Sequence, residues 1–293
     1  MIKGEFEKTQ NCIDNAFIVK TFKGRFFPRP MHYHQECEIM LILNGEGLCF
    51  VGDDIINYET GDIFFFSGGL PHFFRSSRKY YDYTYNPKDY NESQYIQFKE
   101  DILPANYMNM PGCKNFKHLI NNGKFGIVWK NKKNFNKSYI IKLFKDMRNT
   151  CYFPRLNKLY ILIDYLGQNV SEGEKISSNP ESLIEFSKDS IYKNIVEYLS
   201  LNFHNHISLD DLAKKIGMNK SSMCRYFKKK TGESIFSLLL KLRISYAKNQ
   251  ISNTDYTISQ IAFDSGFNNI SHFNVKFKNA TGYTPTEYRK SLI

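Results

Sequence analysis

The period of the apolar pattern changes once along this chain. Between residues 36 and 75, short apolar runs alternate with glycine-containing turns, a rhythm that is typical of β-strands. The predicted strands are Cys37–Leu43, Leu48–Val51, Ile55–Tyr58, Ile63–Phe66 and His72–Phe74. Such close spacing of short strands favours a sandwich or a small barrel.

From about Tyr139 onward the apolar residues recur at helical spacing and predict helices over 139–147 and 156–166. The stripe on the second helix either packs on the preceding β-domain or forms a dimer interface, and the sequence leaves both uses open. This stripe consists of Leu156, Leu159, Ile163 and Leu166. The polar segment that follows predicts a linker over residues 168–187. Helical periodicity resumes at Ile191 and continues to the C-terminal end.

An internal repeat of about 50 residues is the most informative feature of the C-terminal region. Ser208–Met218 matches Thr257–Phe267 at an offset of 49 residues, and Phe227–Gly232 matches Phe277–Gly282 at an offset of 50. The second copy therefore has one extra residue between the two matching blocks.

Each copy carries the signals of two consecutive helices. Ser208 and Thr257 are N-cap residues, each with a partner three positions later, Asp211 or Gln260. A glycine then ends the first helix, and the following helix directs two apolar residues inward. These inward residues are Met223 and Phe227 in the first copy and Phe273 and Phe277 in the second. A helix, a glycine turn and a second helix form the helix-turn-helix pattern, in which the second helix enters the DNA major groove.

The second copy resembles the signature of the AraC family of bacterial transcription regulators. The resemblance covers about residues 188–293, and it is carried by Gly266–Phe273, Phe277-Lys278, Thr281–Pro285 and Tyr288-Arg289. It implies a long helix joining the two units, which Ile235–Ile251 fits. It also implies that the second helix of each unit, called here a reading helix, lies in the major groove.

The resemblance further implies which side chains meet DNA. The outward positions are Ser221, Cys224 and Arg225 on the first reading helix, and Ile270, Ser271, His272 and Val275 on the second. Arg225 can read guanine through two hydrogen bonds. Val275 stands where a basic residue is common in the family, so the second unit reads thymine methyls, reads DNA shape, or mainly positions the protein. The candidates for phosphate contacts are Lys228, Lys229, Lys230, Lys276 and Lys278.

The charge distribution agrees with a nucleic-acid partner for this region. The formal net charge of the 293-residue chain is +11, of which residues 188–293 carry +8 with 16 Lys/Arg against 8 Asp/Glu. A composition of 42% hydrophobic and 24% charged residues is that of a globular protein. The six cysteines form no C-x-x-C pair, which argues against a zinc ribbon and fits reduced thiols. Without a signal peptide or an apolar run of membrane-spanning length, the expected location is the cytoplasm, with no membrane partner.

A group of histidines in the predicted β-domain is the second candidate site. His32, His34 and Glu38, followed by Gly45, then Gly61-Asp62 and His72, resemble the two motifs of cupins. In cupin enzymes three histidines and a glutamate hold a divalent metal, and imidazole and carboxylate ligands suit Fe, Mn, Ni or Zn. The alternatives are a metal-free effector pocket, a bound metal, or no pocket at all. We predict the first, with His32, His34, Glu38 and His72 as effector-binding residues and no metal or other cofactor.

These observations predict an α+β protein of two domains. Residues 1–167 form a cupin-like β-barrel with trailing helices, residues 168–187 a linker, and residues 188–293 an all-α DNA-binding domain with two helix-turn-helix units. The predicted function is a non-enzymatic, effector-responsive transcription regulator. Its expected partners are double-stranded DNA, a small-molecule effector, a second copy of the chain and, for an activator, RNA polymerase. The alternative is a metal-dependent cupin enzyme fused to a DNA-binding domain.

Overall fold

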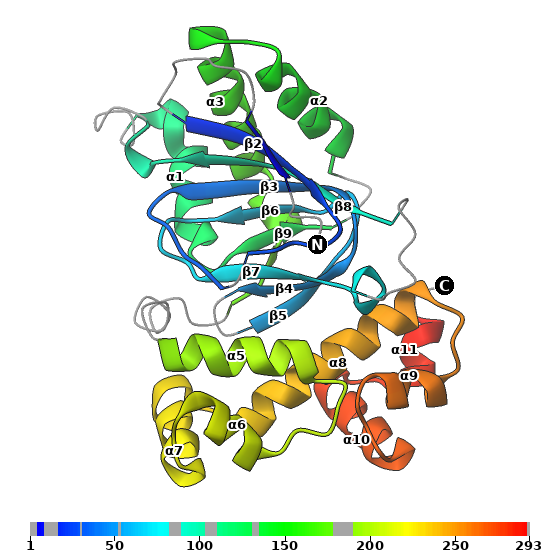
Figure 1. The fold of residues 1–293 in the computed structure, drawn as a ribbon. Coiled ribbons are helices and arrows are strands. Elements are labelled where there is room, and N and C mark those ends of the chain that lie inside the picture. Colours follow the sequence, from blue (N-terminus) through cyan, green and yellow to red (C-terminus); the bar gives the residue numbers. More distant parts are fainter. Residues whose placement is uncertain are drawn as a thin grey trace. The chain divides into compact units, whose positions relative to one another are not determined.

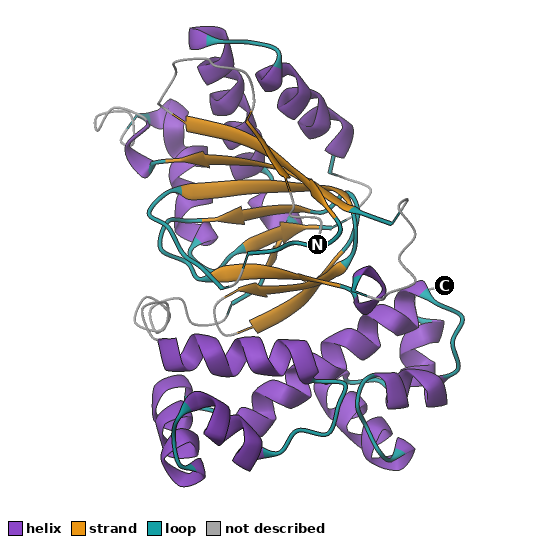
Figure 2. Ribbon diagram, in the orientation of Figure 1, coloured by secondary structure: helices purple, strands orange, loops and turns teal. Residues whose placement is uncertain are grey.

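The computed structural model describes residues 5–8, 17–29, 31–51, 54–81, 89–102, 110–130, 135–177 and 190–291. The chain separates into two compact units, one formed by Met1–Asp54 and Tyr58–Ile184 and the other containing Glu185–Ile293 (Figure 1). The first unit is rich in β-strands with helices against one sheet, and in the second unit, which also takes in Ile55–Asn57, the secondary structure of the described residues 190–291 is helical (Figure 2). The predicted fold class is therefore confirmed.

Two sheets form the framework of the first unit. The larger has the strand order β1-β2-β8-β3-β6-β9-β10, and the smaller has the order β5-β4-β7. The strands are β1 Glu5–Lys8, β2 Phe17–Gly24, β3 Cys37–Asn44, β4 Gly47–Val51, β5 Asp54–Tyr58, β6 Ile63–Phe66, β7 His72–Ser76, β8 Asn91–Phe98, β9 Ile127–Trp129 and β10 Glu174–Lys175. All five strands expected between residues 36 and 75 are present, whereas β2, β8 and β9 have no counterpart in the sequence prediction.

The central strand β3 is buried on both faces, which explains why its sequence is a continuous apolar run rather than an alternating one. One face, which includes Ile39 and Leu41, packs against three helices: α1 Lys114–Gly123, α2 Lys137–Arg148 and α3 Tyr152–Gln168. The other face turns toward the smaller sheet, where Phe64 of β6 meets Phe74 of β7 edge-on at 5.2 Å between ring centroids. Short 3₁₀ turns lie at Arg78–Tyr80, Glu100–Ile102 and Pro111–Cys113.

The apolar stripe on α3 belongs to the core of its own unit. Leu159, Ile163 and Leu166 are at most 1% exposed and pack in the cluster between the helices and the large sheet. Of the two uses left open by the sequence, packing on the parent β-domain is therefore the observed one. The exposed apolar side chains of α2 and α3 lie elsewhere, at Tyr139 and Ile161 among others.

The segment expected to be a linker begins as part of the first unit. Val170–Glu172 forms a 3₁₀ turn, and β10 pairs with β9. Ile176 is buried, and the indole Nε1 of Trp129 donates to the carbonyl of Asn169 at 2.8 Å. The polar composition of this stretch suggested a linker, but backbone pairing needs no apolar side chains. Residues 178–187 of the expected linker lie outside the described residues.

The helical unit contains the doubled motif. Its helices are α5 Ser190–Asn202, α6 Leu209–Ile216, α7 Lys220–Thr231, α8 Ile235–Asn253, α9 Ile258–Asp264, α10 Ile270–Thr281 and α11 Pro285–Lys290. Ser208 caps α6, and Thr257 with Gln260 forms a complete capping box on α9. Gly217 at the end of α6 and Gly266 after α9 both have positive φ. The predicted caps, turns and inward-facing side chains are confirmed.

Two arginines hold equivalent places in the two copies. Arg243 of α8 donates to the carbonyl of Phe203 at 2.7 Å and to that of Asn205 at 3.0 Å. In the second copy, Arg289 of α11 donates to the carbonyl of Tyr256 at 2.7 Å. In each copy an arginine on the helix that follows the reading helix in sequence thus holds the loop that leads into the first helix of the motif.

Among the described residues, Cys37, Cys49, Cys113 and Cys224 are free thiols. Cys151, however, is disulfide-bonded, which corrects the expectation that the thiols are reduced. No helix in the described part of the chain is long and apolar enough to cross a membrane.

Candidate functional site

The strand register of the large sheet brings polar side chains together on its inner face. Glu38 of β3 lies opposite Gln97 of β8 on one side and opposite Phe66 of β6 on the other. Side chains directly opposite one another in an antiparallel pair share one face of the sheet. The carboxylate of Glu38, which is only 4% exposed, therefore faces the interior of the β-domain.

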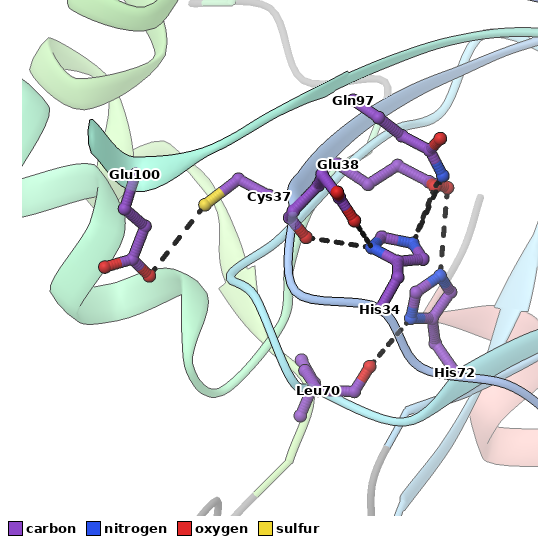
Figure 3. Close-up of polar contacts among 8 residues, drawn as sticks. His34, Cys37, Glu38, Leu70, His72, Gln97 and Glu100 are labelled. Atoms are coloured by element: carbon purple, nitrogen blue, oxygen red, sulfur yellow. Dashed lines mark hydrogen bonds and ion pairs between the residues drawn. The ribbon is translucent and has the colours of Figure 1, made fainter. Parts of the chain in front are cut away.

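Glu38 is held by partners from two segments (Figure 3). The amide Nε2 of Gln97 donates to Glu38 Oε2 at 2.8 Å, and His34 Nε2 lies 3.1 Å from the same oxygen. His34 Nδ1 donates to the backbone carbonyl of Glu36 at 2.9 Å. With Nδ1 occupied as a donor, Nε2 can donate to the carboxylate only if the imidazole carries both protons.

The electrostatics of this pair favour the charged form of both groups. Burial of the Glu38 carboxyl raises its pKa, but the hydrogen bond from His34 and the nearby imidazoles of His34 and His72 outweigh burial, so the pKa lies well below its ordinary value. Burial lowers the pKa of His34, but the hydrogen bond and charge of Glu38 outweigh this effect and leave it raised. Both shifts favour an imidazolium–carboxylate pair, because each widens the pH range over which its group is charged.

His72 approaches the same carboxylate from β7. Its Nδ1 donates to the carbonyl of Leu70 at 2.8 Å, so in the neutral ring Nε2 carries a lone pair. That Nε2 is buried, lies 3.8 Å from Glu38 Oε1, and has no hydrogen-bond partner within the described part of the chain. His32 pairs with His72 through backbone hydrogen bonds of 3.2 and 3.0 Å, and their rings lie 4.6 Å apart.

A cavity of about 40 Å³ lies beside these side chains. Glu38, His72 and Ser93 line it together with the aromatic rings of Phe27 and Phe74. The remaining lining residues are Phe22, Pro28, Arg29, His32, Met40 and Tyr95. The hydroxyl of Ser93 is buried and, like His72 Nε2, has no hydrogen-bond partner among the described residues. Since a water molecule needs roughly 10–15 Å³ of such volume, the cavity has room for a compact polar solute.

The donor set also fits a divalent metal ion. One nitrogen each of His32, His34 and His72 lies within 4.8 Å of the others. Backbone carbonyls hold Nδ1 of His34 and of His72, an arrangement that orients Nε2 in many metal sites, and the unpaired Nε2 of His72 would gain a partner. These imidazoles with Glu38 would hold such an ion, which would supply a Lewis acid able to bind an effector oxygen.

The structure therefore brings His32, His34, Glu38 and His72 together. It does not bring Asp62 into this group, because Asp62 precedes β6 whereas Phe66, the neighbour of Glu38, ends that strand. Asp62 is instead fully buried and accepts a hydrogen bond from Lys130 Nζ at 2.6 Å.

Sequence reasoning missed the contribution of β8, which supplies Ser93, Tyr95 and Gln97 to the inner face. Their spacing of two residues was a usable signal of a strand with one polar face.

The second candidate site is the exposed face of the two reading helices, α7 and α10. Ser221 and Arg225 are exposed on α7, and Cys224 is half-buried. All four outward positions predicted on α10 are exposed, namely Ile270, Ser271, His272 and Val275. Among the lysines, Lys228, Lys229 and Lys278 are exposed, whereas Lys230 and Lys276 are half-buried. The orientation required for DNA contact is present, and the contacts themselves stay a prediction.

Comparison with protein families gives a match in each unit. Residues 16–99 match the AraC-like ligand binding domain, and this range contains all four predicted effector-binding residues. Residues 212–291 match a helix-turn-helix domain, and this range contains α7 and α10.

Similar proteins of known sequence are named as regulators. An uncharacterized HTH-type transcriptional regulator of Bacillus subtilis (strain 168), YdeC, is 23% identical over 265 residues, which is 89% of this chain and 86% of that protein. An HTH-type transcriptional regulator of Staphylococcus aureus (strain COL) is 33% identical over 101 residues, 34% of this chain but only 14% of the relative's length.

Among solved structures, ToxT from Vibrio cholerae O395 covers 95% of this chain and 99% of its own at 14% identity and a TM-score of 0.37. The DNA-binding domain of AdpA in complex with a target DNA covers 35% of this chain and 92% of its own, at 22% identity and a TM-score of 0.33.

Proposed function

This chain is an AraC-family transcription regulator with a ligand-binding N-terminal domain and a DNA-binding helix-turn-helix domain. We propose that a small hydroxylated effector, bound in the cavity beside Glu38 and His72, controls its binding to promoter DNA. The proposed effector-binding residues are His32, His34, Glu38 and His72. The proposed domains are residues 1–167 for sensing, 168–187 as connection and 188–293 for DNA binding, with the correction that pairing with the first unit extends to Lys175.

One observation carries the pocket assignment: two buried polar atoms that line one cavity, His72 Nε2 and Ser93 Oγ, have no hydrogen-bond partner among the described residues. An unpaired buried polar group costs about 1–3 kcal/mol, so a solute that pairs with both would be stabilised in the cavity. In neutral His72 the free Nε2 is an acceptor, and the Glu38 carboxylate accepts as well. Both therefore call for a ligand that donates hydrogen bonds, as a hydroxyl group does.

The link from this cavity to DNA binding is energetic. A ligand that favours one of two arrangements of the domains by a few kcal/mol changes the population of the DNA-binding form by orders of magnitude. Glu38 and Gln97 lie on central strands of the large sheet, whose opposite face packs on α1, α2 and α3. A shift of these strands on ligand binding would therefore be felt by the helices behind them.

We propose that the chain is not an enzyme and that the pocket works without a metal. The names of the similar proteins and of the matched domains describe regulators, which supports the first part and gives no support to the fused cupin enzyme. The hydrogen bond from Gln97 and the ion pair with His34 already engage the Glu38 carboxylate, which supports the second.

The remaining proposals concern partners. The contacts with double-stranded DNA would be made by Ser221, Cys224, Arg225, Lys228, Lys229, Ile270, Ser271, His272, Val275, Lys276 and Lys278. A homodimer is supported by the exposed apolar residues of α2 and α3, and RNA polymerase is a partner if the protein activates. Since its DNA is there, the protein would act in the cytoplasm.

The test begins with DNA sites found by genome-wide occupancy. The affinity of the full-length protein for such a site would be measured with a panel of small polyols, sugars and hydroxy acids. We expect at least one compound to change the Kd about tenfold or more, which corresponds to 1.4 kcal/mol.

The variant His34→Ala/His72→Ala, and separately Ser93→Ala, should lose this response and keep basal DNA binding, whereas the exposed Lys142→Ala should behave as wild type. A double variant that still responds would place the sensory pocket elsewhere. Stoichiometric metal in the purified protein, lost in the double variant, would favour the metal alternative.

A further inference from the structure

The two reading helices can be compared position by position. Both α7 and α10 contain 12 residues, begin after an asparagine cap whose side chain accepts from the backbone N–H three residues later, and end at a glycine with φ of +76° or +82°. The inward residues Met223 and Phe227 correspond to Phe273 and Phe277. An offset of 50 residues therefore pairs every position of one helix with its equivalent in the other.

The positive charge of α7 is absent from equivalent positions of α10. Lys220 corresponds to Ile270, Arg225 to Val275, Lys229 to Asn279 and Lys230 to Ala280. Lys228 and Lys278 are the cations that both helices share at one position, and Lys276 of α10 is the counterpart of Tyr226. The two helices thus present the same geometry with different chemistry.

Apolar side chains replace the charge at two outward positions of α10. Val275 is 56% exposed and Ile270 is 37% exposed, although the inner face of the helix already has a complete apolar core around Phe273 and Phe277. Ile270 is the first residue of α10, and the N-terminal residues of a reading helix are those that contact base edges. Val275 lies four residues after Ser271, on the same side of the helix as Ser271, and roughly 140° around the helix axis from Ile270.

The apolar group that the DNA major groove offers to such side chains is the C5-methyl of thymine. Guanine and cytosine present hydrogen-bonding groups there, which valine and isoleucine leave without partners. Nearby Lys278 is exposed and can contact a phosphate while the apolar side chains contact bases.

We propose that the two helix-turn-helix units divide the recognition of DNA: α7 reads guanine through Arg225 and holds the backbone with its lysines, and α10 reads thymine methyl groups through Val275 and Ile270. The preferred DNA site then consists of two unlike halves about one helical turn apart, one containing guanine and the other rich in thymine. This inference rests on the proposed assignment of α7 and α10 as reading helices.

The test uses duplexes in which uracil replaces thymine in one half-site at a time, since uracil lacks only the methyl group. The full-length protein would first be bound to a site obtained by selection from random duplexes. Replacing thymine by uracil in the α10 half should weaken binding about fourfold per contacted methyl, the value of burying one such group. The same replacement in the α7 half should leave the affinity within about twofold.

Variants assign the effect to the side chain. Val275→Ala should weaken binding to the thymine site and make it insensitive to uracil in the contacted position. Val275→Thr, which keeps a methyl group, should retain the sensitivity. Arg225→Ala, the matched change on α7, should keep the uracil effect and lose discrimination against replacement of guanine in the other half. Melting temperatures within a few degrees of wild type would establish that each variant is folded.

The outcomes separate this inference from the proposed function. Selective binding that ignores uracil in both halves, or a Val275→Ala protein that responds to uracil at every position as wild type does, overturns the division of recognition and leaves the regulator assignment standing. A protein that binds no duplex selectively overturns both. Sensitivity to uracil that only Val275→Ala removes supports the inference.

Discussion

His34 Nε2 lies 3.1 Å from Glu38 Oε2, and the side chain of Glu38 is almost wholly buried beneath it. The neighbouring groups favour the charged form of this pair, because the carbonyl of Glu36 accepts from His34 Nδ1 and the amide of Gln97 donates to the Glu38 carboxylate. The pair therefore links the stability of the β-domain to pH in a direction that can be worked out.

The first prediction concerns that pH dependence. The raised pKa of His34 gives a stabilisation that is complete below its ordinary value of 6.5 and is lost as the pH rises through the raised value. The lowered pKa of Glu38 gives a stabilisation present above its ordinary value of 4.5 and lost as the pH falls through the lowered value. The pair should therefore stabilise the unit most between about pH 4.5 and 6.5.

Thermal melts of the full-length protein and of His34→Gln across this range are the measurement. The variant should be less stable at pH 6 by roughly 1–3 kcal/mol, the contribution of a charge-assisted hydrogen bond, and the difference should shrink as the pH approaches 9. A difference that does not change between pH 6 and 9 would contradict a charged His34.

The second prediction concerns the dimer. The exposed Tyr139 and Ile161 line a groove beside α2 and α3, so Tyr139→Glu with Ile161→Glu should leave a folded protein whose dimer dissociates at least about tenfold more readily. Sedimentation across micromolar concentrations measures the change. Phe236→Glu, a change at an apolar position on α8 that is more exposed than either, should not alter the dimer. Wild-type protein that sediments as a monomer throughout would refute the proposal.

The third prediction compares two glycines whose backbone φ angles are both positive. Gly217 has φ +76° and open space around its α-carbon, so Gly217→Ala should cost only the backbone term of about 1–2 kcal/mol. Gly266 has φ +86°, and an added Cβ would lie 2.5 Å from the carbonyl oxygen of Phe203. Gly266→Ala should therefore destabilise the helical unit clearly more than Gly217→Ala in urea unfolding. Equal losses would show that the loop shifts to accommodate the methyl group.

The fourth prediction tests the domain boundary and the lysines together. Residues 188–293 alone should bind duplex DNA, with an affinity that falls steeply with salt because lysines that neutralise phosphates release counterions. Lys228→Ala with Lys229→Ala should reduce the slope of log K against log salt by about 0.9 for each phosphate that the protein no longer neutralises. An unchanged slope would show that these two side chains do not bind the DNA backbone.

The sequence predicted those parts of the fold whose signals are local. The caps Ser208 and Thr257 and the inward Phe273 depend on neighbours a few residues away, and all are as expected. Strand β8 escaped prediction because it carries polar residues on both faces, Ser93 and Gln97 on the inner one and the buried Gln94 on the other, which weakens the alternation that its inner face shows.

In the candidate pocket, too, the local signals were predictable and the contacts made by strand pairing were not. Its histidines and Glu38 follow a recognisable spacing, but Gln97 reaches Glu38 only through strand register, which joins residues 59 positions apart. The sequence left the use of the stripe on α3 open for a related reason. An apolar helix face has the same sequence pattern whether it packs on its own sheet or on a second chain. Only the folded structure shows that Leu159 and Ile163 pack in the core.

The paired arginine contacts have a consequence for how the helical unit comes apart. Arg243 and Arg289 each hold the loop that leads into one repeat. Helix α8 contributes the buried side chain of Leu242 and, to the core of the second repeat, those of Ala247 and Ile251. Because Gly266 of the second repeat lies against the Phe203 carbonyl that Arg243 binds, the two repeats are coupled at this loop, and α8 is the segment that we expect to stay ordered longest. Amide hydrogens in the middle of α8 should accordingly exchange last, after those of α6 and α7 and those of α9 to α11.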